Sequence, residues 1–433
     1  MSAMGIIIEK AASAYEPEKF KNSFGFKGNK LTGVWQTAVM LVGGGELGIG
    51  LGIESVLWSD SSVFAKYGED KSNQLMFAVT EYAAELIEGK EFSSPKELID
   101  YVFTPSLEYA KEITGMSVTE TFVLNALVPL DMAAWQLYAR LSGADSFDYI
   151  YRGDEKCEKL ANIPLITYGT PLDEVRKMAD EGVCIFKIKL GSDPEGDGDR
   201  RKMLEWDKMR ALNIHNTVKN ISTPYTECGK IVYYFDANGR YDTKERLCEL
   251  VSFFEDNGIA ERTVLFEEPF APENEIYLGD IPICFAADES AHSLNDVNRR
   301  IALGYKAITL KPIAKTLTVS KEMAEAAYSA GVQCFCADLT VNPLMVEWNK
   351  NFAARLKLLS GMKIGVVESN GAQNYVNWEE MKGYINRKST ESDATVYTLN
   401  SEFYSNAGGL FTIPEHYKEL VKRRYPDIFG GDE

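Results

Sequence analysis

The sequence predicts an α/β protein built around a TIM-type (β/α) barrel. Two observations predict this class. From about residue 162 to residue 371, short apolar segments alternate with segments of helical periodicity. In addition, charged residues recur where five successive apolar segments end, as expected where the loops after parallel strands build one face of a barrel. A doubly wound parallel sheet is the alternative that the same alternation allows.

The residues before the alternating region have a mixed pattern. Strand-like stretches near residues 34–44 and 50–58 precede a long helical region from about Asn73 to Leu141. In that region the apolar residues 127, 130, 134, 137 and 141 share one helical face, and Gly143 follows as a stop signal. The motif GGGELG at 43–48 fits a dinucleotide-binding pattern, but no helix follows it, so we predict a β-hairpin there.

Eight strands are predicted in the alternating region, with helical patterns between them. They are IPLITYG, VCIFKIKL, IVYYFDA, RTVLFEEP, PICFAAD, KAITLKP, VQCFCAD and KIGVVES. The last 60 residues, from Ala372, contain many aromatic residues and no further strand-helix unit, so we expect them to pack back on the first part of the chain. The expected division is 1–155, 156–371 and 372–433.

The composition excludes several classes of partner. The formal net charge of −18 argues against nucleic acid and against anionic membranes, because both require a basic patch. We also find no export signal and no uncharged apolar run long enough to span a membrane. The seven cysteines show no metal-binding spacing, and their odd number fits a reducing compartment, so we expect a cytoplasmic protein.

The charges at the predicted strand ends indicate a metal site. Carboxylates end the third, fourth and fifth strands at Asp236, Glu267 and Asp288, while lysines end the second and sixth strands. Three converging carboxylates suit a hard divalent cation, so we predict Mg²⁺, with Mn²⁺ as the alternative. Such a cation can bind a substrate carboxylate and stabilise the enediolate formed when the neighbouring C–H group loses its proton.

The lysines are the predicted acid–base groups. Lys187 and Lys189 alternate along one strand and therefore point to the same face, and Lys311 ends the sixth strand. A lysine acts as a base only when its pKa falls below its usual value of about 10.4. The charge of Lys187, a nearby cation and partial burial would each lower the pKa of Lys189.

This ordered set of motifs resembles the enolase superfamily, and within it the subgroup of muconate lactonizing enzymes in the mandelate racemase/muconate lactonizing enzyme family. The resemblance rests on KIK, DAN, EEP, ADES and LKP in this order, and on LDMAAWQLYARLSG before them. It implies an N-terminal α+β capping domain (1–155), a (β/α)7β barrel (156–371) and a C-terminal segment that completes the cap. It also implies Mg²⁺ on Asp236, Glu267 and Asp288, with acid–base roles for Lys189 and Lys311.

Other polar residues near these motifs are predicted to bind substrate or to support the site. They are Asn238, Glu268, Glu289, His292, Asp338 and Glu368. Glu268 stands where the family commonly has glutamine. The segment near residues 213–230 is longer than one helix and its loops require, so we predict an insertion on the side away from the active face.

Three functions are compatible with the sequence. The first is a Mg²⁺-dependent isomerase, namely a racemase, epimerase or cycloisomerase, in which two lysines exchange protons on opposite faces of an enolised carboxylate. The second is a lyase that dehydrates an acid sugar or hydroxy acid through the same intermediate. The third is a non-catalytic barrel with a vestigial metal site. We favour the isomerase, acting on a small-molecule carboxylate, and expect a homo-oligomer.

Overall fold

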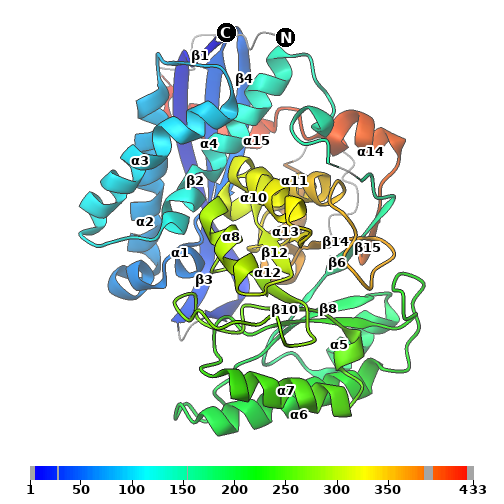
Figure 1. Ribbon diagram of the computed structural model, residues 1–433. Coiled ribbons are helices and arrows are strands. Elements are labelled where there is room, and N and C mark those ends of the chain that lie inside the picture. Colours follow the sequence, from blue (N-terminus) through cyan, green and yellow to red (C-terminus); the bar gives the residue numbers. More distant parts are fainter. Residues whose placement is uncertain (1–4, 27–28, 154, 385–393, 427–433) are drawn as a thin grey trace.

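The computed structural model describes residues 5–26, 29–153, 155–384 and 394–426. The N-terminal part combines a three-stranded antiparallel sheet with helices (Figure 1). The strands of this sheet are β2 (Lys10–Phe26), β3 (Asn29–Gly43) and β4 (Glu46–Ile53), and the short strands β1 (Ile6–Ile7) and β5 (Glu91–Phe92) pair with each other. Its helices are α1 (Val56–Ser59), α2 (Ser61–Ile87), α3 (Pro95–Thr114) and α4 (Glu120–Leu141).

The predicted barrel is confirmed as a curled ten-stranded sheet, with strand order β15-β6-β14-β13-β12-β11-β10-β9-β8-β7. Its parallel strands are β6 (Lys159–Ile163), β7 (Leu165–Ile166), β8 (Ile185–Lys189), β9 (Val232–Asp236), β10 (Thr263–Glu267), β11 (Phe285–Ala287), β12 (Ala307–Leu310), β13 (Gln333–Cys336) and β14 (Gly365–Glu368). β6 pairs with β14, and β7 pairs with β8. β6 and β7 lie at opposite ends of the run of parallel strands, and only Pro164 separates them in the chain. The parallel strands therefore close around one core.

Helices alternate with these strands along the chain. They are η1 (Phe147–Tyr149), α5 (Leu172–Asp180), α6 (Arg200–Val218), α7 (Lys244–Asp256), η2 (Ala260–Arg262), α8 (Leu294–Ala302), α9 (Pro312–Lys315), α10 (Leu317–Ser329), α11 (Pro343–Ala353), α12 (Gly371–Asn374) and α13 (Trp378–Lys382). The strands contribute almost wholly buried segments, as expected for a parallel sheet covered by helices. No helix in the described part of the chain is long and apolar enough to cross a membrane.

The hairpin predicted at GGGELG is confirmed. β3 and β4 pair in antiparallel register on either side of Gly44 and Gly45, and both glycines have positive φ. Farther along β4, a Cβ atom on Gly50 would lie 2.0 Å from the carbonyl oxygen of Pro129, and one on Gly48 would lie 2.1 Å from that of Ala133. Glycine therefore allows helix α4 to lie directly on the sheet.

Two predictions about the elements were wrong in detail. The long helical region is three helices, because Gly89 with its positive φ and Gly115 as the C-cap of α3 interrupt it. The last 60 residues do contain a strand, β15 (Val396–Thr398), which pairs antiparallel with β6 and is followed by α14 (Ser401–Asn406), η3 (Ala407–Gly409) and α15 (Glu415–Arg424). α15 packs on β2 and β3. The division at residues 155 and 371 stays a prediction.

The predicted insertion lies where α6 leads into β9. It folds into a turn closed by the bridge between Ser222 and Lys230. Its backbone also bonds to the segment before β14, from Lys363 N to the Tyr225 carbonyl at 2.9 Å and from Glu227 N to the Gly361 carbonyl at 2.9 Å. The insertion therefore covers the amino ends of the barrel strands, opposite the strand ends that carry the predicted site.

Asp131 of α4 joins the N-terminal part to the barrel and gives a pH-dependent prediction. Its carboxylate accepts from Leu317 N at 2.8 Å and Thr318 N at 3.3 Å, the first residues of α10. Burial raises the pKa of Asp131 from 3.8 to about 6 despite these bonds. The folded state therefore binds a proton more tightly than the unfolded chain, and this contribution to stability is present below pH 4 and lost as the pH rises through 6.

We expect Asp131→Asn to remove this pH dependence. The unfolding free energy of the wild type, measured relative to the variant, should fall by about 2 kcal/mol between pH 4 and pH 8. Urea unfolding at both pH values measures the difference, and Asp70→Asn, at an exposed position, is the control. Equal pH profiles for the wild type and Asp131→Asn would contradict the prediction.

Candidate metal and acid–base site

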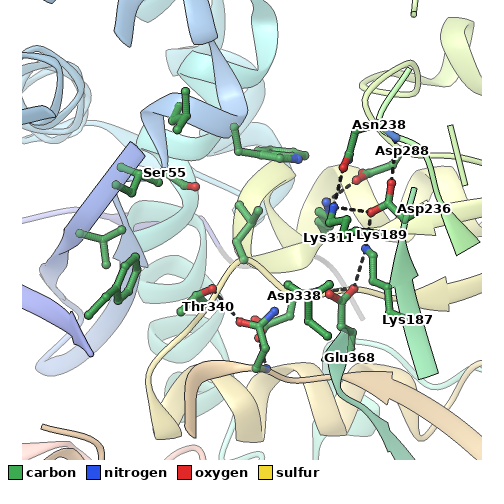
Figure 2. Close-up of a pocket in the computed structure, with 18 residues that line it drawn as sticks. Ser55, Lys187, Lys189, Asp236, Asn238, Asp288, Lys311, Asp338, Thr340 and Glu368 are labelled. Carbon is green, nitrogen blue, oxygen red and sulfur yellow. Dashed lines mark hydrogen bonds and ion pairs between the residues drawn. The ribbon is translucent and has the colours of Figure 1, made fainter. Parts of the chain in front are cut away.

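The structure brings the predicted charged residues together at the carboxyl ends of the barrel strands (Figure 2). In the sheet, β9, β10 and β11 lie between β8 and β12. The three inner strands end at or next to the predicted metal ligands, and the two outer strands end at or next to the lysines. The order of the strands thus places carboxylates between lysines, as the sequence predicts.

The two lysines of β8 have different surroundings. Lys187 Nζ lies 3.1 Å from Asp236, 3.1 Å from Glu267 and 3.2 Å from Glu368, and its side chain is 5% exposed. Burial alone would lower the pKa of Lys187, but Glu267, Glu368 and Asp236 outweigh it and raise the pKa well above its ordinary value. Lys187 is therefore a fixed cation.

Lys189 lies closer to the pocket. Its Nζ donates to Asp236 Oδ2 at 2.6 Å and to Asn238 Oδ1 at 2.6 Å, and its side chain is 13% exposed. Asn238 Nδ2 in turn donates to Glu289 Oε1 at 2.8 Å. Asn238 and Glu289 thus form a chain of contacts that orients the Lys189 amine.

Lys311 lies on the other side of the carboxylates and forms an ion pair with Asp288. Its Nζ also lies 4.3 Å from the ring centre of Trp58, a residue of the N-terminal part. Burial would lower the pKa of Lys311, but the charge of Asp288 raises it above its ordinary value. In this arrangement Lys311 carries a proton that it can donate.

The carboxylates form a compact, buried cluster. One oxygen from each of Glu267, Asp288 and Glu289 lies within 4.8 Å of the others, which is compatible with shared coordination of a cation. Asp236 differs from these three, because its Oδ2 pairs with both lysines of β8. Although burial would raise the pKa of Asp236, Lys189 and Lys187 lower it, so this carboxylate stays charged.

The donor set fits a hard divalent cation. Carboxyl groups outnumber lysines in this part of the described structure. The seven buried carboxyl groups are Asp236, Glu267, Glu268, Asp288, Glu289, Asp338 and Glu368. The four lysines are Lys187, Lys189, Lys311 and Lys315. Burying charged carboxylates in excess of cations is costly, so such a group either gains a cation or takes up a proton, and burial raises the pKa of Glu268 to about 8 and that of Asp338 to about 7. All the available ligand atoms are oxygens, which Mg²⁺ and Mn²⁺ accept.

Glu268 supports the loop that carries Asp288. Its Oε2 accepts from Asp288 N at 2.7 Å, Ser290 N at 3.2 Å and Ser290 Oγ at 3.0 Å, and its backbone has a φ of 42°. Burial, followed by the charge of Glu289, raises the pKa of Glu268 to about 8. Glu268 therefore holds the Asp288 loop in place from a strained backbone position.

The remaining predicted residues fall into two groups. Asp338 and Glu368, at the ends of β13 and β14, line the same pocket as the lysines. Burial raises the pKa of Asp338 to about 7. His292 does not line this pocket; its Nδ1 lies 2.5 Å from Thr121 Oγ1 of α4, between the N-terminal part and the barrel.

Sequence reasoning missed two residues of the site. Lys315 is buried one helical turn after Lys311, and its Nζ donates to the carbonyl oxygens of Asp288 and Ala291 at 2.7 Å. The spacing of four residues from Lys311 was the available signal. Trp58 had no such signal, because it comes from a distant part of the chain.

No family model and no curated protein matches the sequence. Solved structures do match across most of the chain. A mandelate racemase/muconate lactonizing protein from Herpetosiphon aurantiacus matches with a TM-score of 0.69 and 16% identity, over 93% of this chain and 98% of that one. The chain has the fold of the enolase superfamily.

Two other structures with this enolase-superfamily fold carry named activities. An N-succinyl Arg/Lys racemase from Bacillus cereus matches with a TM-score of 0.69 and 14% identity, over 96% of this chain and 98% of that one. A dipeptide epimerase from Enterococcus faecalis, complexed with Mg and a dipeptide, matches with a TM-score of 0.66 and 15% identity, over 93% and 99%. The enolase-superfamily fold is thus established for this chain.

Proposed function

We propose that the protein is a Mg²⁺-dependent isomerase that moves the proton on the carbon next to a substrate carboxylate, as a racemase, epimerase or cycloisomerase. The observation that carries this proposal is the placement of Lys189 and Lys311 on β8 and β12, on opposite sides of the carboxylate-bearing strands β9 to β11. The racemase and epimerase named among the structural matches support it.

Asp236, Glu267 and Asp288 are the proposed metal ligands. When bound, the divalent cation would supply positive charge that stabilises the negative charge developing on the substrate as the carbon next to its carboxylate loses a proton. Lys187 adds a fixed positive charge on the same side, held by its three carboxylate neighbours. Glu268 keeps the Asp288 loop in position.

The two other lysines move the proton. In one direction the neutral Lys189 amine takes the α-proton, and the C–H bonding electrons remain on the substrate as an enediolate. The Lys311 ammonium then donates a proton to the opposite face of the same carbon, which inverts its configuration. For the other enantiomer the two roles are exchanged.

Proton NMR in D₂O tests this function. The protein is incubated with Mg²⁺ and pooled chiral carboxylates, including amino-acid derivatives, dipeptides and acid sugars, with a parallel sample in EDTA. We expect loss of an α-proton signal that requires Mg²⁺, with no new product for a racemase and only an isomer of the substrate for an epimerase or cycloisomerase. A keto-acid signal would replace the isomerase with a dehydrating lyase, and no exchange in any pool would contradict proton abstraction altogether.

A further inference from the structure

The pocket above the predicted metal site has two unlike sides. Its cavity has a volume of about 70 Å³ and opens to solvent. One side consists of the lysines and carboxylates at the strand ends. Figure 2 shows Ser55 of the N-terminal part and Thr340 of the barrel on the other side, away from the lysines.

The rest of the pocket lining is mainly apolar. The N-terminal part contributes Phe20, Leu31, Val34 and Leu57, and the barrel contributes Leu165 and Leu339, while the Trp58 ring lies against Lys311. A substrate group placed here loses contact with water. An apolar group gains free energy from this burial, whereas a charged group needs an oppositely charged partner.

Among the described residues that line the pocket, the positive charges all lie at the metal side. The cationic residues among those that line it are Lys187, Lys189 and Lys311, and each pairs with a carboxylate of the barrel. The charged groups at the ends of β13 and β14 are acidic, namely Asp338 and Glu368. A second carboxylate on a substrate would therefore meet repulsion there and find no cation among the lining residues.

The acidic groups are already engaged within the protein. Glu368 pairs with Lys187 at 3.2 Å, and Asp338 accepts from Asn370 N at 2.8 Å and Val341 N at 3.3 Å. A substrate cation would have to compete with these partners while being buried among leucine side chains.

The polar groups that remain for a ligand are neutral. Asn370 Oδ1 accepts from the Thr340 hydroxyl at 2.6 Å, which leaves the Asn370 amide nitrogen as a donor that has no acceptor in the described part of the chain. Such a donor suits a carbonyl or hydroxyl oxygen of an uncharged group.

We propose that the substrate is a carboxylate with a single negative charge, whose other substituents are apolar and uncharged. This inference rests on the proposed function for the placement of the carboxylate at the metal. The apolar body lies against the wall formed by the N-terminal part, and no second charged group of either sign enters that side of the pocket. Dicarboxylates and carboxylates with an ammonium group are disfavoured.

Three probes of similar length test the proposal without turnover. Hexanoate, adipate and 6-aminohexanoate share a six-carbon chain, which ends in a methyl, carboxylate or ammonium group. Isothermal titration to the Mg²⁺-loaded protein should give at least 10-fold tighter binding of hexanoate than of either other probe. Adipate or 6-aminohexanoate binding as tightly as hexanoate, or no measurable hexanoate binding, would overturn the proposal.

A charge introduced into the apolar wall provides a second test. Leu339→Arg should reverse the preference, so that adipate binds at least 10-fold more tightly than hexanoate. The control is Leu358→Arg, the same change at a residue that is 40% exposed and does not line the pocket. An unchanged preference in Leu339→Arg, with Mg²⁺ binding retained, would count against the proposal. If the binding tests fail but the protein still exchanges the substrate α-proton in D₂O with Mg²⁺, only the inference about substrate charge is contradicted. If the binding tests succeed but no α-proton exchange is found, only the proposed function is contradicted.

Discussion

Replacing Lys311 with alanine is expected to lower the rate of racemisation by about 1,000-fold. A positioned acid–base group contributes about 10²–10⁴-fold to a proton transfer. Lys311 is buried and lies on the side opposite Lys189, so water cannot readily take its place. The variant is assayed with the acid that shows exchange in D₂O, by following both optical rotation and the α-proton signal.

The stereochemistry of the residual reaction makes this test specific. In Lys311→Ala, Lys189 still reaches one face, so one enantiomer should continue to exchange its α-proton while interconversion is lost. Lys189→Ala should show the opposite enantiomer preference. Lys306→Ala, at an exposed lysine at the base of β12, is the control and should keep both activities. Unchanged racemisation by Lys311→Ala would exclude the two-base mechanism.

The face that carries the candidate site was predictable because two simple backbone relations specify it. Alternation along β8 places Lys187 and Lys189 on one face, and parallel strands place their carboxyl ends at the same edge. Asp236, Glu267 and Asp288 therefore converge although they are up to 52 residues apart in the chain. Both relations depend on the backbone alone, so they can be predicted without knowing how the side chains pack.

Other features depend on contacts that no local pattern contains. Trp58 meets Lys311 only because the N-terminal part packs on the barrel, and β15 pairs with β6 across more than 200 residues of chain. The pairing of Asp236 with both lysines of β8 is likewise a matter of side-chain geometry.

Replacing Glu267 with glutamine is expected to weaken Mg²⁺ binding by at least about 100-fold. Changes in groups that merely support a metal ligand cost about 10–100-fold in affinity, and Glu267 is itself a proposed ligand at the centre of the cluster. Binding is measured by Mn²⁺ titration followed by EPR, and independently by thermal unfolding. At 100 times the dissociation constant, the cation should stabilise the wild type by about 2.7 kcal/mol, and this gain should fall to about 0.4 kcal/mol or less in Glu267→Gln.

Two further variants decide the ligand set. Asp236→Asn should weaken binding as strongly as Glu267→Gln, whereas Glu289→Gln should keep Mg²⁺ affinity within a few-fold, because Glu289 is proposed to orient Asn238. The reverse result would make Glu289 the third ligand, since its carboxylate already lies within 4.8 Å of Glu267 and Asp288. Asp236 would then serve to hold Lys187 and Lys189, and the metal would lie nearer to Lys311 than the sequence motifs predict.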